Sequence, residues 1–155
     1  MSGNFEARLT ELGEALPDAP APAANYVPFV ISGDLVFISG QISKDGDGNM
    51  ITGKLGADMS VEAGQAAAKV CALNLIAQLK AACGGDLGRL VKVVKLGGFV
   101  NCTPDFTDHP AVINGASDFF GSVFGDTGAH ARAAVGCASL PLGVAVEIEG
   151  IFQIS

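Results

Sequence analysis

The chain has few of the residues on which several classes of protein depend. It contains two histidines, His109 and His130, and four cysteines, with no CxxC pair and no His-x-x-x-His spacing. This pattern does not match a zinc site, so we expect no metal ion. We expect the cysteines to be reduced thiols that pack as small hydrophobic residues. A catalytic cysteine would also need a base beside it.

Basic residues are scarce as well. Nine lysines and arginines stand against 16 aspartates and glutamates, which gives a net charge of −7. An acidic surface repels phosphate backbones, so we expect no nucleic-acid partner. No apolar run reaches the roughly 18 residues needed to cross a bilayer, and the first residues lack the basic and apolar parts of a signal peptide. We therefore expect no membrane association and a cytoplasmic location.

Apolar residues, in contrast, are abundant. They make up 49% of the 155 residues, enough to build the core of one domain over 1–155 and to hide apolar surface between subunits. Within 1–20, apolar residues recur at helical spacing from Asn4 to Leu16 and predict an N-terminal helix. Pro17 ends this helix and begins a stiff, proline-rich connector.

The rest of the chain predicts strands and helices in turn. Gly33 and Asp34 separate two β-rich segments and indicate a hairpin, and Gly40 predicts a bulge or a close approach in its second strand. Ser60 is a plausible N-cap, and Gly125 closes a later helix. The predicted elements are strands at 27–32 and 35–39, a helix at 60–82, a strand at 90–100, a helix at 108–125, and a final hairpin at 131–150. This order predicts an α+β fold with helices on one face of a mixed or antiparallel sheet.

Charges interrupt both strands of the predicted final hairpin. Arg132 opens the first strand, and Glu147 and Glu149 lie in the second with the same strand parity. Charges inside strands cost desolvation energy unless they are paired or used. One interpretation is a salt bridge from Arg132 to Glu147 or Glu149 across the hairpin. The other is a clamp in which the guanidinium binds the carboxylate of a small acid.

Several motifs together resemble a known family. They are Phe37-Ile-Ser39-Gly40-Gln41, Val94-Lys95, Asn114, and Ala131-Arg132-x-x-Val135…Leu140-Pro141…Val146-Glu147-Ile148-Glu149. In this order they resemble the Rid family of reactive enamine/imine deaminases, also described as endoribonuclease L-PSP or translation inhibitor proteins. The resemblance runs from about Ala21 to Ile154. It implies a chorismate-mutase-like fold with two long helices on one face of the sheet, here with an extra N-terminal helix, and a barrel-like homotrimer with clefts between subunits.

The resemblance also implies a set of site residues and a reaction. An arginine at the position of Arg132 holds the substrate carboxylate, and Glu147 positions or activates water. The implied substrate-binding set is Tyr26, Ser39, Gly40, Asn114, Arg132 and Ala134. The reaction is hydrolysis of small 2-imino or enamine acids to 2-oxo acids and ammonia, with no metal or organic cofactor.

Structural roles are the alternatives for most of these residues. Tyr26 could be a core residue, Ser39 and Gly40 a simple bulge, and Asn114 a helix-stabilising side chain. His130 could be an acid–base group or a surface or interface residue.

The chain also departs from the best-known members. Ala129-His130 replaces their usual Phe-Pro, Ala134 replaces a frequent cysteine, and the stretch 101–114 is distinctive. These departures keep a second hypothesis open, in which the trimer binds or senses a metabolite without converting it. Ribonuclease activity is disfavoured by the acidic balance and by the lack of a cluster of His, Lys and Arg.

Overall fold

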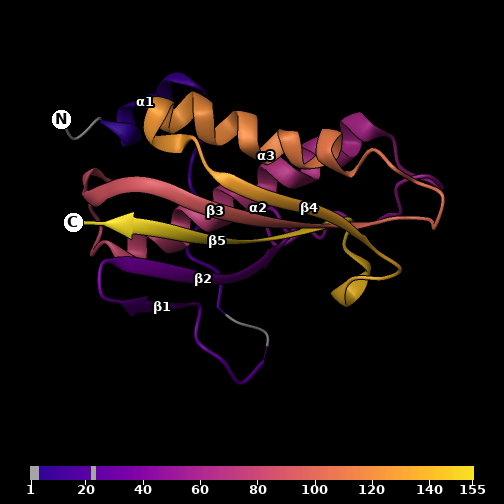
Figure 1. Ribbon diagram of the computed structural model, residues 1–155, viewed down its shortest axis with the longest axis horizontal. Helices are drawn as coiled ribbons and strands as arrows, with labels where there is room; N and C mark the ends of the chain where they lie inside the picture. Colours follow the sequence, from indigo (N-terminus) through magenta and orange to yellow (C-terminus); the bar gives the residue numbers. More distant parts are fainter. Residues whose placement is uncertain (1–3, 22–23) are drawn as a thin grey trace.

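The computed structural model describes residues 4–21 and 24–155. Its centre is a five-stranded mixed sheet in the order β1-β2-β5-β3-β4, with helices α2 and α3 packed on one face (Figure 1). The strands are β1 (Phe29–Ser32), β2 (Leu35–Ile42), β3 (Leu90–Asn101), β4 (Ala131–Cys137) and β5 (Val146–Ile154). The α-helices are α1 (Phe5–Glu11), α2 (Val61–Ala82) and α3 (His109–Phe124). The predicted α+β class and mixed sheet are therefore confirmed.

The predicted final hairpin is wrong. Strands β4 and β5 do not pair: β4 runs parallel to β3 at one edge of the sheet, and β5 lies between β2 and β3, antiparallel to both. The reason is that α3 joins β3 to β4 as a crossover connection, which leads to parallel pairing. The turn at Pro141–Gly143 then carries the chain from this edge to the centre of the sheet, with Leu142 at a φ of 60°.

Small residues allow the two long helices to pack closely. Helix α2 is rich in alanine, and its N-cap Ser60 accepts a hydrogen bond from the amide of Ala63, as expected for a helix start. In α3, a Cβ added to Gly115 would lie 2.2 Å from the backbone oxygen of Gln65 in α2. The two helices therefore approach each other to backbone contact at Gly115.

The N-terminal helix is shorter than predicted. Helix α1 ends at Glu11, because Gly13 adopts a φ of +75° and turns the chain away. Phe5 is buried with its ring edge-on to Phe124 of α3, at 4.8 Å between ring centroids. Helix α1 thus extends the same apolar core.

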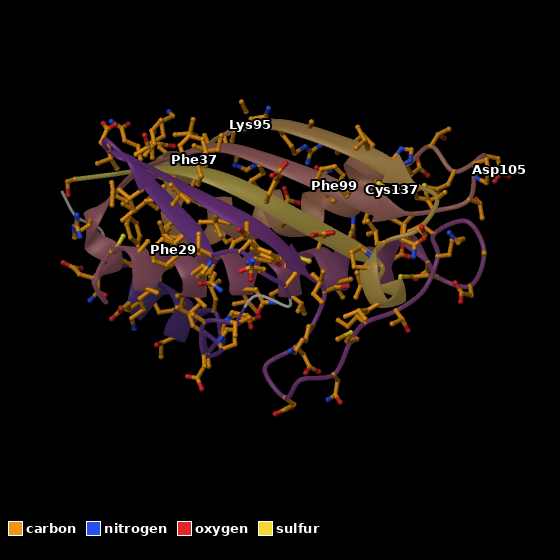
Figure 2. All side chains as sticks on the ribbon, turned by 90° about the horizontal axis from the view of Figure 1, so that it is seen from below. Phe29, Phe37, Lys95, Phe99, Asp105 and Cys137 are labelled. Atoms are coloured by element: carbon orange, nitrogen blue, oxygen red, sulfur yellow. The ribbon has the colours of Figure 1, made fainter. Side chains whose placement is uncertain are left out.

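The opposite face of the sheet is open. Figure 2 shows the helices on one side only, with Phe37, Lys95 and Phe99 along the other. Phe37 and Val135 on this open face are 42% and 46% exposed. None of the helices in the described part of the chain is both long and apolar enough to cross a membrane.

Candidate active site

Arg132 is held by two polar side chains of α3. Its Nη1 donates to Oδ1 of Asn114 at 2.8 Å and to Oγ of Ser117 at 3.1 Å. Asn114 and Ser117 are three positions apart, so they lie on one face of the helix. The parallel pairing of β3 and β4 places Arg132 opposite Leu96, on the helix-covered face. The structure therefore brings together Arg132 and Asn114, two residues of the set that the resemblance implies.

These contacts use only some of the hydrogen-bond donors of the Arg132 guanidinium. The two hydrogens of Nη1 are used by Asn114 and Ser117, which leaves Nε–H and both hydrogens of Nη2. Within residues 4–21 and 24–155, Arg132 forms no ion pair, and neither Nε nor Nη2 donates a hydrogen bond. The expected alternative, a salt bridge to Glu147 or Glu149, is thus absent from the described structure. The free edge of the guanidinium has the geometry for a bidentate carboxylate.

A second cluster lies around Glu147. A cavity of about 170 Å³ opens beside this half-buried residue. Its walls include Tyr26, Gly40, Gln41, Met50, Leu142 and Glu147. Tyr26 is 49% exposed, so it is not a core residue. Three of the predicted site residues, Tyr26, Gly40 and Glu147, therefore share one cavity.

The bulge in β2 shapes this cavity. The pairing of β2 with β5 shifts between Ile38 and Gln41, which confirms the predicted irregularity. A Cβ added to Gly40 would lie 2.4 Å from Oε1 of Glu147, so a glycine is required for the carboxylate to lie against β2. The hydroxyl of Ser39 does not point at the cavity as a free donor; it donates to the carbonyl of Val27 at 2.8 Å. Ser39 thereby fixes the segment that follows Tyr26.

The carboxyl group of Glu147 is electrostatically perturbed. Partial burial, and then repulsion from the neighbouring carboxylate of Glu149, raise the pKa of Glu147 above its usual value. Both side chains lie on the open face, as their shared strand parity predicted. In the described structure no hydrogen bond or ion pair satisfies the Glu147 carboxylate. A raised pKa brings a carboxyl group closer to the range in which it can both accept and donate a proton.

The two clusters lie on opposite faces of the sheet. Arg132 is paired with Leu96 of β3, whereas Glu147 is paired with Phe99 of the same strand. Leu96 and Phe99 are three positions apart, and successive side chains of a strand alternate between faces. Ala134 lies on the side of Arg132, opposite Gly98 and packed against the core. The predicted site residues therefore form two groups within one chain, not one.

The structure also adds residues that sequence reasoning missed. Ser117 accepts from Arg132 and contacts His130, which the sequence left open as an acid–base group or a surface or interface residue, and Gln41 lines the Glu147 cavity. Gln41 and His130 stand inside or beside recognisable motifs, but Ser117 carries no such signal. All four cysteines are free thiols. One of them, Cys102, lies 3.4 Å from Nε2 of His109, a contact that the sequence did not reveal.

Comparison with known proteins identifies the family. Residues 6–149 match the family model described as "YjgF/chorismate_mutase-like, putative endoribonuclease". The chain belongs to the YjgF/Rid family. This membership confirms the resemblance drawn from the sequence motifs. In the part of the YjgF/Rid chain that the structure describes, no group of three or more His, Cys, Asp or Glu side chains could hold a metal ion.

Individual relatives cover nearly the whole chain. Protein TCP17 of Trypanosoma cruzi is 50% identical over 99% of this chain and 96% of its own length. A 2-iminobutanoate/2-iminopropanoate deaminase of Dermatophagoides farinae is 34% identical over 89% of this chain and 92% of its own. The crystal structure of Atu1372 from Agrobacterium tumefaciens, a protein of unknown function, has a TM-score of 0.91 at 48% identity, over 99% of this chain and 96% of that one. The fold is thus shared with YjgF/Rid proteins.

Proposed function

We propose that this protein hydrolyses small 2-imino or enamine acids to 2-oxo acids and ammonia. The observation that carries the proposal is the Arg132 guanidinium, which is anchored through Nη1 and presents its remaining donors without a protein carboxylate to fill them. A related protein is named as a 2-iminobutanoate/2-iminopropanoate deaminase, which supports the same class of substrate. A 2-imino acid offers both a carboxylate for the guanidinium and an electrophilic carbon next to it.

The working site would be completed by a second copy of the chain. Arg132 and Glu147 face opposite sides of one sheet, so they can meet at one ligand only if they come from different subunits. Two unlike surfaces in contact form a heterologous interface, which cannot give a twofold dimer and generates a ring when the rotation between copies closes. The exposed apolar side chains of the open face, such as Phe37 and Val135, supply the surface such an interface would bury. A homotrimer is the ring we propose.

The chemistry needs little beyond orientation and proton transfer. The guanidinium of Arg132 would hold the carboxylate, and the carboxylate of Glu147 would take a proton from a water molecule as its oxygen adds to the imine carbon. The Glu147 carboxyl group would pass this proton to the nitrogen, which gives a carbinolamine. It would then move the hydroxyl proton to the amine in the same way as the C–N bond breaks, so that ammonia leaves and the carbonyl forms. The raised pKa of Glu147 suits this double role, because the group must change protonation state during the reaction.

The decisive experiment measures hydrolysis of imines generated in situ. An amino-acid oxidase would supply the 2-imino acid, and release of the 2-oxo acid would be compared with the spontaneous rate. We expect acceleration by the wild-type protein and a loss of at least about 100-fold in kcat/KM for Arg132→Ala, because two charged hydrogen bonds are removed. Arg132→Lys should restore little, since an ammonium cannot form the bidentate contact. Full activity of Arg132→Ala would refute the proposal.

The same assay separates catalysis from simple binding. If calorimetry shows that 2-oxobutanoate binds to the wild-type protein but no imine is turned over, the protein is a metabolite-binding member of the family. Glu147→Gln should behave in this way by design, retaining acid binding through Arg132 while losing turnover. This variant is therefore the positive control for binding without chemistry.

A further inference from the structure

His130 is connected to Arg132 by an uninterrupted chain of hydrogen bonds. Nδ1 of His130 contacts the carbonyl oxygen of Gly128 at 2.6 Å, and its Nε2 contacts Oγ of Ser117 at 2.9 Å. The same Ser117 oxygen accepts from Nη1 of Arg132 at 3.1 Å. The imidazole ring is further fixed by an edge-on contact with Phe120, at 6.1 Å between ring centroids. The histidine therefore lies behind the guanidinium, one side chain removed from it.

The donor and the acceptor of each hydrogen bond in this series follow from its two ends, the carbonyl of Gly128 and the guanidinium of Arg132. A carbonyl oxygen can only accept, so Nδ1 of His130 must carry the hydrogen that points at Gly128. In a neutral imidazole Nε2 is then an acceptor, and the hydroxyl hydrogen of Ser117 points toward it. Both lone pairs of the Ser117 oxygen are left for other donors, of which Nη1 of Arg132 is one. The tautomer of His130 thus directs the Ser117 hydroxyl hydrogen away from Arg132, so that this hydrogen does not compete with the hydrogen bond that Ser117 accepts from Nη1.

From this geometry we infer that His130 is a positioning residue for the substrate carboxylate, acting through Ser117 on the orientation of Arg132. This inference rests on the proposed function. Without His130, the Ser117 hydroxyl could rotate and direct its hydrogen toward the guanidinium, and only Asn114 would still fix Nη1. The free edge of Arg132 would then occupy a wider range of orientations, and an acid would bind less well.

Two substitutions separate this role from a structural one. In His130→Gln the side-chain oxygen can reach the position of Nε2 and accept from Ser117. In His130→Asn the amide nitrogen can reach the position of Nδ1 and keep the bond to Gly128, but nothing accepts from Ser117. We expect His130→Asn to raise KM about 3- to 10-fold with kcat changed by less than about twofold, as for the loss of one hydrogen bond in binding. His130→Gln should restore most of the wild-type KM.

A double-mutant cycle tests the route through Ser117. Ser117→Ala alone should raise KM to a similar extent, and adding His130→Asn to it should cause no further change. The same pattern is expected for the dissociation constant of 2-oxobutanoate. Additive effects of the two substitutions would overturn the inference, as would equal KM values for His130→Asn and the wild type, or a His130→Gln variant no better than His130→Asn.

A spectroscopic measurement tests the inference without activity. Nitrogen-15 NMR of the wild-type protein labelled at histidine distinguishes the two neutral tautomers, and we expect the Nδ1-protonated form at His130. Nitrogen-15 labelling at arginine should show that rotation about the Cζ–Nη bonds of Arg132 is faster in His130→Asn than in the wild type. An Nε2-protonated His130 would refute the hydrogen-bond chain. Absence of both imine hydrolysis and 2-oxobutanoate binding would instead refute the proposed function. The tautomer of His130 measured by NMR would still test the hydrogen bonds from His130 to Gly128 and Ser117.

Discussion

The two faces of the sheet hold the opposite charges of the candidate site in different ways. On the helix-covered face, Arg132 is anchored to Asn114 and Ser117 of a helix that is itself packed against α2. On the open face, Glu147 lies in a cavity without a hydrogen-bonding partner among the described residues, and apolar side chains around it are exposed. The cation is thus preorganised by its own chain, whereas the carboxylate lies where another molecule can complete its surroundings.

The largest effect is expected from mixing subunits. If each cleft takes Arg132 from one copy and Glu147 from its neighbour, Arg132→Ala and Glu147→Gln should each be nearly inactive. Refolding the two variants together at equal amounts should restore activity in about a quarter of the clefts, because half of the arginines and half of the glutamates are intact and they combine independently in a ring. Activity in the coupled imine assay measures this.

The control for the mixing experiment is each variant refolded alone. Native mass spectrometry should show three copies in every sample, including the mixed one. No recovery in trimers that demonstrably contain both variants would show that the two faces do not serve one cleft. Dimers instead of trimers would contradict the ring arrangement itself.

A substitution at Gly40 should disturb Glu147 on the open face and leave Arg132 on the other face unchanged. Gly40→Ala would place a methyl group 2.4 Å from Oε1 of Glu147 and force the carboxylate away from β2. We expect kcat to fall by at least about 10-fold, since proton transfer depends on the position of this group. Binding of 2-oxobutanoate through Arg132 should change much less. The matched control is Gly46→Ala, whose added Cβ would meet only Pro17, at 3.7 Å.

The features of the fold that could be predicted from the sequence are those set by residues close together in the chain. The bulge at Gly40, the start of α2 at Ser60 and the end of α3 at Gly125 follow from residue chemistry over a few positions, and the structure has each of them. The motifs also gave the family. In contrast, the hairpin prediction for β4 and β5 failed, because β5 is placed by pairing with β2 and β3, which are distant in the chain.

The same distinction applies within the site. The sequence identified Arg132, but its face of the sheet depends on the parallel register with β3, which no local pattern encodes. Ser117 was missed because its role arises only when α3 packs beside β4. The separation of Arg132 from Glu147 was hidden for the same reason, since a hairpin would have placed their strands side by side. The resemblance to a known family named most of the participants, and tertiary pairing determined their arrangement.

Substitutions at two glycines of α3 test how closely this helix packs against α2. Gly115→Ala would press its methyl group into the backbone of α2 at Gln65, so we expect a loss of about 1–3 kcal/mol in the free energy of unfolding. Gly121→Ala has no atom within 4 Å of the added Cβ and should stabilise the helix by about 0.5–1 kcal/mol. Urea unfolding at a fixed protein concentration measures both. Equal effects of the two substitutions would show that α2 and α3 are not in close contact.

The smallest effect expected is a pH dependence of stability on the open face. Because burial and Glu149 raise the pKa of Glu147 in the folded protein, the folded state binds this proton more tightly than the unfolded state. Where the folded state binds more protons, stability falls as pH rises. The penalty is absent below the ordinary pKa of a glutamate, grows as pH rises through the raised pKa, and persists above it. Glu147→Gln should remove it, so this variant should gain stability over the wild type between pH 4 and pH 7.

Glu149→Gln sharpens the measurement because it removes the repulsion but keeps the burial. In this background the pKa of Glu147 should lie closer to its ordinary value, so the gain from adding Glu147→Gln should be smaller than in the wild type. Unfolding free energies of the four proteins at pH 4 and pH 7 test this, and other titrating groups cancel when the differences are compared. A gain that does not change with pH would show that Glu147 is fully solvated in the folded protein. Arg132, which lies on the opposite face, should contribute nothing to this difference.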